Sequence, residues 1–333
     1  MTTNTGNCFG KLCNNINTTN DLSADDTLKK TPLNQLKIMG SYASYSSSGS
    51  YYAVKTSLEQ LQKNISLQNR FIHLDVYFDV KDGIKIPIVK SEKNPDYLLF
   101  DDCCETIQKH AWSSKIIGQY PLFLFIHLRY NSTNLDVSNT VGDILIKHFS
   151  DNWPDLRYSN GFKNGNLATE ELHNFMNKVV ILTNYANDDG PANTETDTPR
   201  NNGSLNELTH SYIKIYKDVT HMINDNKVNF GAFNYKNVSK DELSMNQYGD
   251  FGKNKEQLKD KFIITLPDYN NSKYAIKTYT FNIKDNSTSL VNVVAMIYYD
   301  IDDKTKLFEL LVNYIIFFTV KGVYMPIRHL HAI

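Results

Sequence analysis

Apolar and polar residues alternate along the chain in blocks that predict strands separated by helices. Short apolar runs at residues 36–39, 70–78 and 84–89 have the length and composition of β-strands. Apolar residues at helical spacing in 52–67 predict a helix between the first two runs. The run 121–128 is almost wholly apolar, as expected of a strand that is buried on both faces.

The alternation continues toward the end of the chain. It predicts helices at 100–112, 167–177, 242–259 and 304–314, and strands at 178–182, 212–216, 262–266, 292–298 and 322–325. Strands separated by helices, repeated about eight times, predict an α/β fold with a closed (β/α)8 barrel of the TIM type. The pattern also leaves open a doubly wound open sheet.

Two polar segments divide this pattern. Residues 1–30 show no hydrophobic period, which predicts a flexible tail or an arm that orders on a partner. Residues 186–206 are rich in Asn, Asp, Thr, Gly and Pro, and predict a linker that interrupts an irregular barrel. We therefore expect a tail at 1–30, a first half-barrel at 31–185, a linker at 186–206 and a second half-barrel at 207–333.

Charge and hydropathy exclude several classes of function. Lys and Arg number 35 against 36 Asp and Glu, so no global basic field recruits nucleic acid. The longest apolar run, 307–320, contains Glu309 and Asn313 and is shorter than the roughly 20 residues of a membrane-spanning helix. No basic start followed by an apolar stretch indicates a secretory signal. We expect an intracellular protein with no transmembrane segment.

Three segments carry a resemblance to a known family. They are Ile-Met-Gly-Ser-Tyr-Ala-Ser-Tyr at 38–45, Phe-Ile-His-Leu-Asp-Val-Tyr at 71–77 and Pro-Leu-Phe-Leu-Phe-Ile-His-Leu at 121–128. Together they resemble the first half of the phosphoinositide-specific phospholipase C catalytic barrel. The strand at 179–184 falls where that family divides its barrel, and 294–299 and 322–328 resemble its last two strands. The resemblance covers roughly residues 32–328 and implies the same barrel fold.

The resemblance also implies a chemistry that can be checked residue by residue. The family uses a calcium ion held by oxygen ligands, and two histidines that move protons while the inositol 2-hydroxyl attacks phosphorus. Where the family has Ser-His-Asn-Thr-Tyr, this chain has Tyr42 in place of the histidine and Ala43 in place of the calcium-binding asparagine. The second histidine position falls at Lys90 or Ser91.

The remaining family positions are also substituted. The Glu-x-Asp pair of calcium ligands is replaced by His73 and Asp75, and the final calcium glutamate by His127. The lysines that bind ring phosphates are replaced by Thr183 and Tyr185. We therefore expect no catalytic residue of the family type, no retained calcium site and no cofactor.

The substituted positions offer other readings. His73 and Asp75 project from one face of a strand, and His127 ends a neighbouring strand, so the three predict either a zinc or iron site or a hydrogen-bonded, metal-free mouth. Lys90 and Arg129 are candidate anion-binding residues. Arg129 can instead pair with Asp75 at the strand end.

We thus predict a catalytically silent phospholipase C-like barrel with a structural or binding role. It resembles the degenerate phospholipase C-like proteins of large DNA viruses, which implies protein partners, including other virion proteins, in a virion or the host cytoplasm. One alternative is an active phosphodiesterase with a rearranged metal site. A third is a non-catalytic module that contacts phosphoinositide membranes through Lys90, Lys93 and Arg129.

Overall fold

The computed structural model describes residues 29–48, 55–67, 69–92, 94–113, 119–129, 135–159, 166–184, 205–216, 219–225, 229–235, 255–267, 291–296 and 318–320. Most of the predicted tail and linker therefore lies outside the described residues. So do the predicted elements at 304–314 and 322–325 and the first part of the helix predicted at 242–259.

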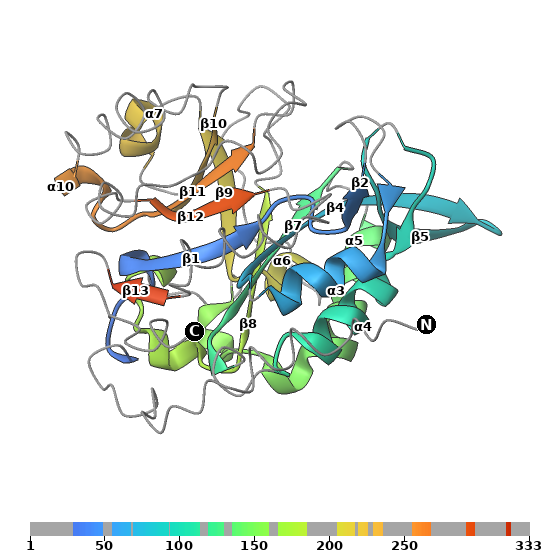
Figure 1. The fold of residues 1–333 in the computed structure, drawn as a ribbon, viewed down its shortest axis with the longest axis horizontal. Coiled ribbons are helices and arrows are strands. Elements are labelled where there is room, and N and C mark those ends of the chain that lie inside the picture. The colour runs from blue at the N-terminus through green and yellow to red at the C-terminus, as the bar shows by residue number, and fades with distance from the viewer. Residues whose placement is uncertain are drawn as a thin grey trace, which may run out of the picture.

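Eight of the described strands form a closed parallel barrel (Figure 1). The ring closes because the first strand pairs in parallel with both the second and the last strand of the series. This confirms the predicted α/β barrel and excludes an open sheet. In order around the ring the strands are β1 (Leu36–Ser41), β4 (Phe71–Lys81), β7 (Leu122–Leu128), β8 (Val179–Asn184), β9 (Ser211–Tyr216), β10 (Phe230–Tyr235), β11 (Phe262–Pro267) and β12 (Val291–Met296).

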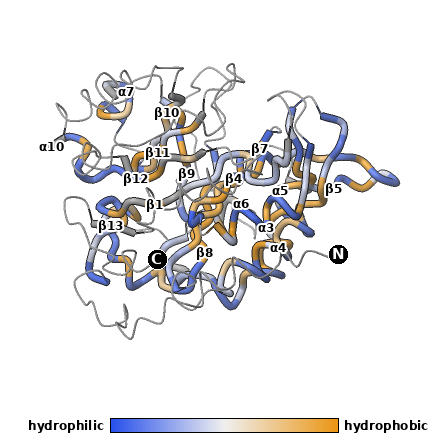
Figure 2. The backbone as a smooth tube through the Cα atoms, viewed as in Figure 1, coloured by the Kyte–Doolittle hydropathy of each residue, from blue (hydrophilic) through white to orange (hydrophobic). Residues whose placement is uncertain are grey.

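Phenylalanine rings pack inside the barrel at the end where the strands begin. Phe123 of β7 stacks on Phe262 of β11 with 5.4 Å between ring centroids, and Phe230 of β10 lies 4.6 Å from Phe262. Because β7 and β11 are not neighbours in the sheet, the first contact crosses the barrel interior. Alternation along β7 then places Phe125 and His127 on the same inner face. Figure 2 shows hydrophobic residues concentrated on these strands.

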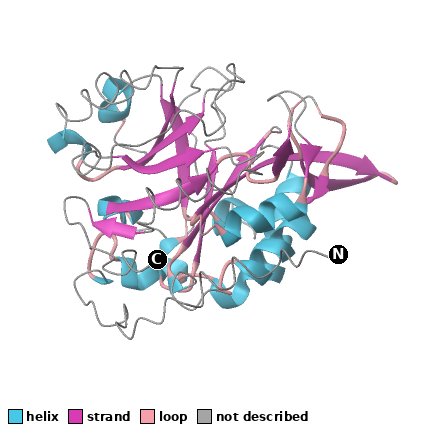
Figure 3. Ribbon diagram, viewed as in Figure 1, coloured by secondary structure: helices cyan, strands magenta, loops and turns pink. Residues whose placement is uncertain are grey.

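Helices cover the outside of the first half of the barrel (Figure 3). They are α3 (Leu58–Ser66), α4 (Phe100–His110) and α5 (Leu135–Phe149). The Ser57 hydroxyl accepts a hydrogen bond from the Gln60 backbone N–H and so caps the start of α3. No helix among the described residues has the length and apolarity to cross a membrane.

Shorter elements complete the described fold. The 3-10 helices are η2 (Leu33–Gln35), η5 (Ser150–Asn152), η6 (Leu156–Tyr158), η8 (Leu167–Thr169) and η9 (Leu172–Phe175). The short α-helices are α6 (Leu205–Leu208), α7 (Val219–Asn224) and α10 (Lys255–Leu258). A two-stranded ribbon joins β2 (Ser46–Ser48) to β3 (Lys55–Thr56).

Three further strands make the barrel irregular. β4 continues into an antiparallel hairpin with β5 (Ile84–Val89), which pairs in turn with β6 (Leu98–Leu99). The hairpin extends beyond the barrel in Figure 1. Asp82 and Gly83 both adopt positive φ at its turn, as the Asp-Gly pair predicts. β13 (Phe318–Val320) pairs antiparallel with the start of β1.

Several predicted elements need correction. The helix predicted at 52–67 begins only at Leu58, because β3 precedes it. The helix predicted at 167–177 is two separate 3-10 helices, η8 and η9. The sequence interpretation missed α5 and β10, and with β10 present the barrel closes at β12 without the strand predicted at 322–325.

Candidate functional site at the barrel mouth

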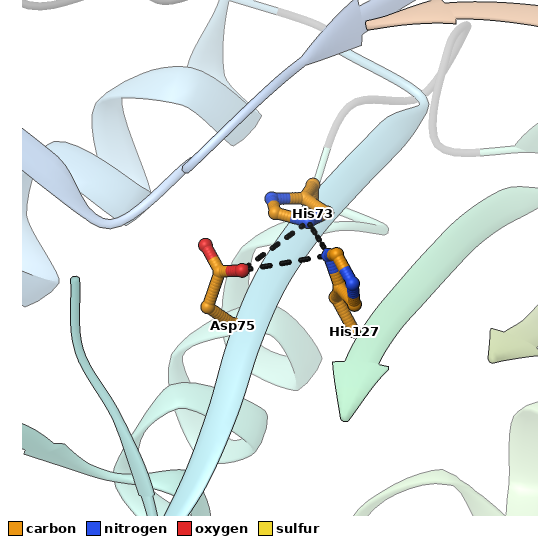
Figure 4. A group of neighbouring side chains, drawn as sticks. All are labelled: His73, Asp75 and His127. Atoms are coloured by element: carbon orange, nitrogen blue, oxygen red, sulfur yellow. Dashed lines mark hydrogen bonds and ion pairs between the residues drawn. The ribbon is translucent and has the colours of Figure 1, made fainter. Parts of the chain in front are cut away.

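Two strands bring a buried polar cluster to the mouth of the barrel (Figure 4). Asp75 of β4 stands in register with His127 of β7, and His73 lies two residues earlier on β4. The His73 Nε2 atom lies 3.4 Å from His127 Nδ1 and 3.9 Å from Asp75 Oδ1, and His127 Nδ1 lies 3.5 Å from the same oxygen. The structure thus brings the three predicted residues together, all of them buried.

The loop after β1 covers this cluster. The Tyr42 ring stacks on the His73 ring, with 4.2 Å between centroids and 12° between planes. The Tyr45 hydroxyl contacts Asp75 Oδ2 at 2.8 Å and the Lys90 carbonyl at 2.9 Å. Tyr42 and Tyr45 are both at most 1% exposed. The loop at 42–45, which we call the plug loop, therefore packs into the mouth as part of the core.

Hydrogen bonds fix the plug loop to β4 and to α3. The Ser44 N–H donates to the His73 carbonyl, and the His73 N–H donates to the Ser44 hydroxyl. The side-chain amide of Asn64, on α3, donates to the Ser44 carbonyl at 2.6 Å. These bonds hold the loop from both sides, so its covering position is built into the native structure.

A further hydrogen bond from the plug loop decides the tautomer of His73. The Ala43 N–H donates to His73 Nδ1 at 3.1 Å. A ring nitrogen that accepts a hydrogen bond carries no proton, so the neutral His73 ring carries its proton on Nε2. That proton points into the cluster, with His127 Nδ1 as the nearest acceptor. The ring as held therefore offers an N–H to the centre of the cluster rather than a lone pair.

Arg129, just beyond β7, supplies the cation of the cluster. Its Nε atom lies 2.7 Å from Asp75 Oδ1, as the sequence interpretation of a strand-end ion pair expected. Burial is the largest single influence and opposes the charge on Arg129, but the charge and hydrogen bond of Asp75, together with neighbouring tyrosines, raise the pKa of the guanidinium above its ordinary value. Arg129 and Asp75 therefore form an ion pair beside the two imidazoles.

Burial and this cation keep both histidines neutral. The pKa of His73 lies well below its ordinary value. Burial is the main cause, and the positive charge of Arg129 lowers the pKa further. The same two causes lower the pKa of His127, although Asp75 acts in the opposite direction. The cluster therefore holds one carboxylate, one guanidinium and two uncharged rings.

The other predicted site residues lie around the cluster rather than in it. The Lys90 ammonium lies 5.2 Å from the centroid of the Tyr77 ring, and the Lys90 N–H donates to the Asp75 carbonyl. Ser91 is buried next to Lys90. Thr183 lies on β8 with its hydroxyl 3.4 Å from that of Thr209. Tyr185 and Lys93 lie outside the described residues.

Comparison with solved structures relates this arrangement to known barrels. No family model and no curated protein matches the sequence. The crystal structures of PLC21 from L. pealei and from S. officinalis each match 88% of this chain, with a TM-score of 0.59 and 16% identity. The fold is that of a phospholipase C-like barrel. The match covers 37% of either PLC21 chain, so this chain spans little more than a third of their length.

Two further structures match this chain with lower TM-scores. A Ca²⁺-dependent phosphatidylinositol-specific phospholipase C from Streptomyces antibioticus matches with a TM-score of 0.49 and 9% identity, over 88% of this chain and 100% of that one. A putative glycerophosphodiester phosphodiesterase from Galdieria sulphuraria matches with a TM-score of 0.43 and 8% identity, over 83% of this chain and 98% of that one.

The mouth of this phospholipase C-like barrel does not fit calcium. Calcium takes six to eight oxygen ligands, several of them carboxylates. Among the described residues of the cluster, Asp75 is the one carboxylate, and its two oxygens already contact Arg129 and Tyr45. Ala43 has no side-chain donor atom at all. The chemistry of the donor set therefore disagrees with the ion that the resemblance implies.

Sequence reasoning missed two contributors to the site. Tyr45 was not singled out, although a tyrosine three residues after Tyr42 in a loop next to a buried aspartate carries a hydroxyl that needs a partner. The Ala43 N–H left no sequence signal, because every residue except proline has this group.

Proposed function

We propose that this chain is a catalytically silent phospholipase C-like barrel that acts as a structural or binding protein. The observation that carries the proposal is the plug loop. In a working barrel of this fold the mouth at the C-terminal ends of the strands is where substrate enters. Here Tyr42 and Tyr45 cover the part of that mouth formed by β4 and contact His73 and Asp75.

The residues at the family's two histidine positions support the same conclusion. Tyr42 is a phenol with an ordinary pKa of about 10, and the aliphatic hydroxyl of Ser91 is weaker still as an acid, so neither exchanges protons readily near neutral pH. Loss of a general acid or base slows a reaction by about 10²–10⁴-fold. Two such losses together with the unsuitable calcium ligands leave little of the family's catalytic power.

The direct test is turnover of phosphatidylinositol and its bisphosphate by the full-length protein, in calcium and in chelator. We expect release of inositol phosphate at the rate of buffer alone in both conditions, with a calcium-dependent phospholipase C as the positive control. Turnover above the blank that disappears in the His127→Ala variant would overturn the proposal.

A second candidate is a phosphodiesterase with a rearranged metal site. The observation in its favour is that ligand atoms of His73, Asp75 and His127 all lie within 4.8 Å of one another. Two imidazoles and a carboxylate suit zinc or iron. The His73 tautomer weighs against it, since ligating histidines normally donate their other ring N–H to an acceptor. Phosphodiester turnover that follows added zinc or iron(II), and is lost in Asp75→Asn, would favour this candidate.

A third candidate is a phosphoinositide-binding module that uses Lys90 and Arg129. It ranks lower because Arg129 pairs with Asp75 and the Lys90 ammonium lies over the Tyr77 ring. Flotation of the protein with phosphatidylcholine vesicles, with and without phosphatidylinositol bisphosphate, separates the candidates. We expect equal recovery with both vesicles. Enrichment on the inositol lipid that Lys90→Ala abolishes would favour the third candidate instead.

The proposed role predicts protein partners, and we propose a virion or virus factory as their location because the chain resembles the phospholipase C-like proteins of large DNA viruses. Under this proposal the protein is present in purified particles at a constant ratio to the major structural proteins. Quantitative mass spectrometry of gradient-purified particles measures that ratio. A ratio that falls steadily with each purification step contradicts a virion role.

A further inference from the structure

The residues at the barrel mouth do not suit calcium, but Arg129 supplies another cation there. We propose that the Arg129 guanidinium is the permanent cation of the barrel mouth and makes its structure independent of any metal ion. The inference concerns what holds the mouth together, so it stands or falls separately from the absence of turnover proposed above.

The first step is the charge of Asp75. A buried carboxylate needs a positive neighbour or several hydrogen bonds, because removal from water penalises its charged form. Arg129 lies 2.7 Å from one of its oxygens and the Tyr45 hydroxyl lies 2.8 Å from the other. The carboxylate is therefore neutralised and hydrogen-bonded by the chain itself.

The second step concerns the ligand atoms that a metal ion would need. An ion between His73, Asp75 and His127 requires a lone pair from each of them. The hydrogen bond from the Ala43 N–H to His73 Nδ1 leaves the proton of His73 on Nε2, the atom that faces the other two residues. To bind an ion through Nε2, the ring would have to move this proton to Nδ1, where it would oppose the Ala43 N–H.

The third step is electrostatic. A divalent cation in the cluster would lie close to Arg129, whose side chain is only 27% exposed and therefore poorly screened. Two positive groups that share one carboxylate repel each other, and burial weakens the screening of this repulsion by solvent. The guanidinium and a metal ion are thus alternatives at this position, and the structure holds the guanidinium in place.

The experiment measures the thermal unfolding midpoint and the metal content of the full-length protein. We expect less than about one metal ion per ten chains after purification, and the same midpoint in calcium, in zinc and in chelator. A metal bound to the native state would raise the midpoint by several degrees. A stoichiometric metal ion, or a midpoint that falls in chelator, would overturn the inference.

Variants test the pair itself. We expect Arg129→Met and Asp75→Asn each to lower the midpoint, and the double variant to lose clearly less than the sum of the two, because the double change removes both charges. Arg129→Lys should recover part of the loss. Losses that simply add would contradict the inference. Arg157→Met is the matched control, since Arg157 pairs with Asp155 on the surface with both side chains more than 60% exposed.

Discussion

The side chains at the mouth combine into a cluster whose protonation is set by the fold rather than by solvent. His73 and His127 are held neutral by burial and by the charge of Arg129. In the unfolded chain both rings would titrate near pH 6.5. Folding therefore excludes protons that the unfolded chain accepts in acid, and this difference links stability to pH.

The first prediction is a loss of stability in mild acid. Because the pKa of both buried rings is lowered on folding, stability is fully present above about pH 6.5 and falls as pH decreases below it, by up to about 1.4 kcal/mol per pH unit for each ring. Urea unfolding between about pH 5 and pH 7 measures the slope. His127→Gln should remove one ring's share of it, and an unchanged slope in that variant would contradict the prediction.

Arg70 gives a second prediction at this scale. Its buried guanidinium donates to the carbonyls of Ala111, Pro121 and Tyr120. Arg70→Met removes all three donors, and each carbonyl left without a donor in the interior costs about 1–3 kcal/mol. We expect a large fall in the free energy of unfolding by urea. Exposed Lys109→Met is the control, and a similar effect in both variants would contradict this role.

At the scale of elements, the sequence indicated the strands better than the helices. Every barrel strand except β10 was predicted, because runs of buried aliphatic and aromatic residues are typical of buried strands. α5 was missed because Ser138, Thr140 and Gly142 lower its intrinsic helix propensity. Its signal was nevertheless present, since Val137, Val141, Leu145 and Phe149 recur every four residues and are all fully buried.

The third prediction concerns the contact between strands β1 and β12. A Cβ atom at Gly40 would lie 2.7 Å from Val293 Cγ1 and 3.3 Å from the Cα atom of Ala295. Gly40→Ala should therefore cost about 1–3 kcal/mol through overpacking, measured by urea unfolding. Gly83→Asn is the control, because Gly83 faces open space and asparagine tolerates its positive φ. Equal losses in the two variants would show that the close approach is unimportant.

At the scale of the whole molecule, residues far apart in the chain close the barrel. The Asn292 side chain, on β12, accepts from the Ile263 N–H and donates to the Leu36 carbonyl at 2.9 Å. It thus joins β11 and β12 to the start of β1. The fourth prediction is that Asn292→Ala loosens this closure and costs about 2–4 kcal/mol, because two buried backbone groups lose partners. A variant with unchanged unfolding and unchanged hydrogen exchange in β1 would contradict it.

How much of the candidate site could be predicted depends on which atoms form it. The sequence interpretation singled out His73, Asp75, His127 and Arg129. Ionisable side chains are rare in apolar strands, and the alternation of side chains along a strand predicts which face they lie on. No sequence pattern predicted that the plug loop covers the cluster, since its anchoring relies on the Ala43 and Ser44 backbone and on the Asn64 side chain. Such bonds depend on the assembled fold and leave no local pattern.

The pairing of β1 with β12 also has a consequence for synthesis. About 250 residues separate these strands, and at about 5–20 residues per second a ribosome needs roughly 10 to 50 seconds to make them. Throughout that interval one edge of β1 has no native neighbour. The nascent chain must therefore shield an unpaired strand edge, and the barrel closes only after β12 has been made.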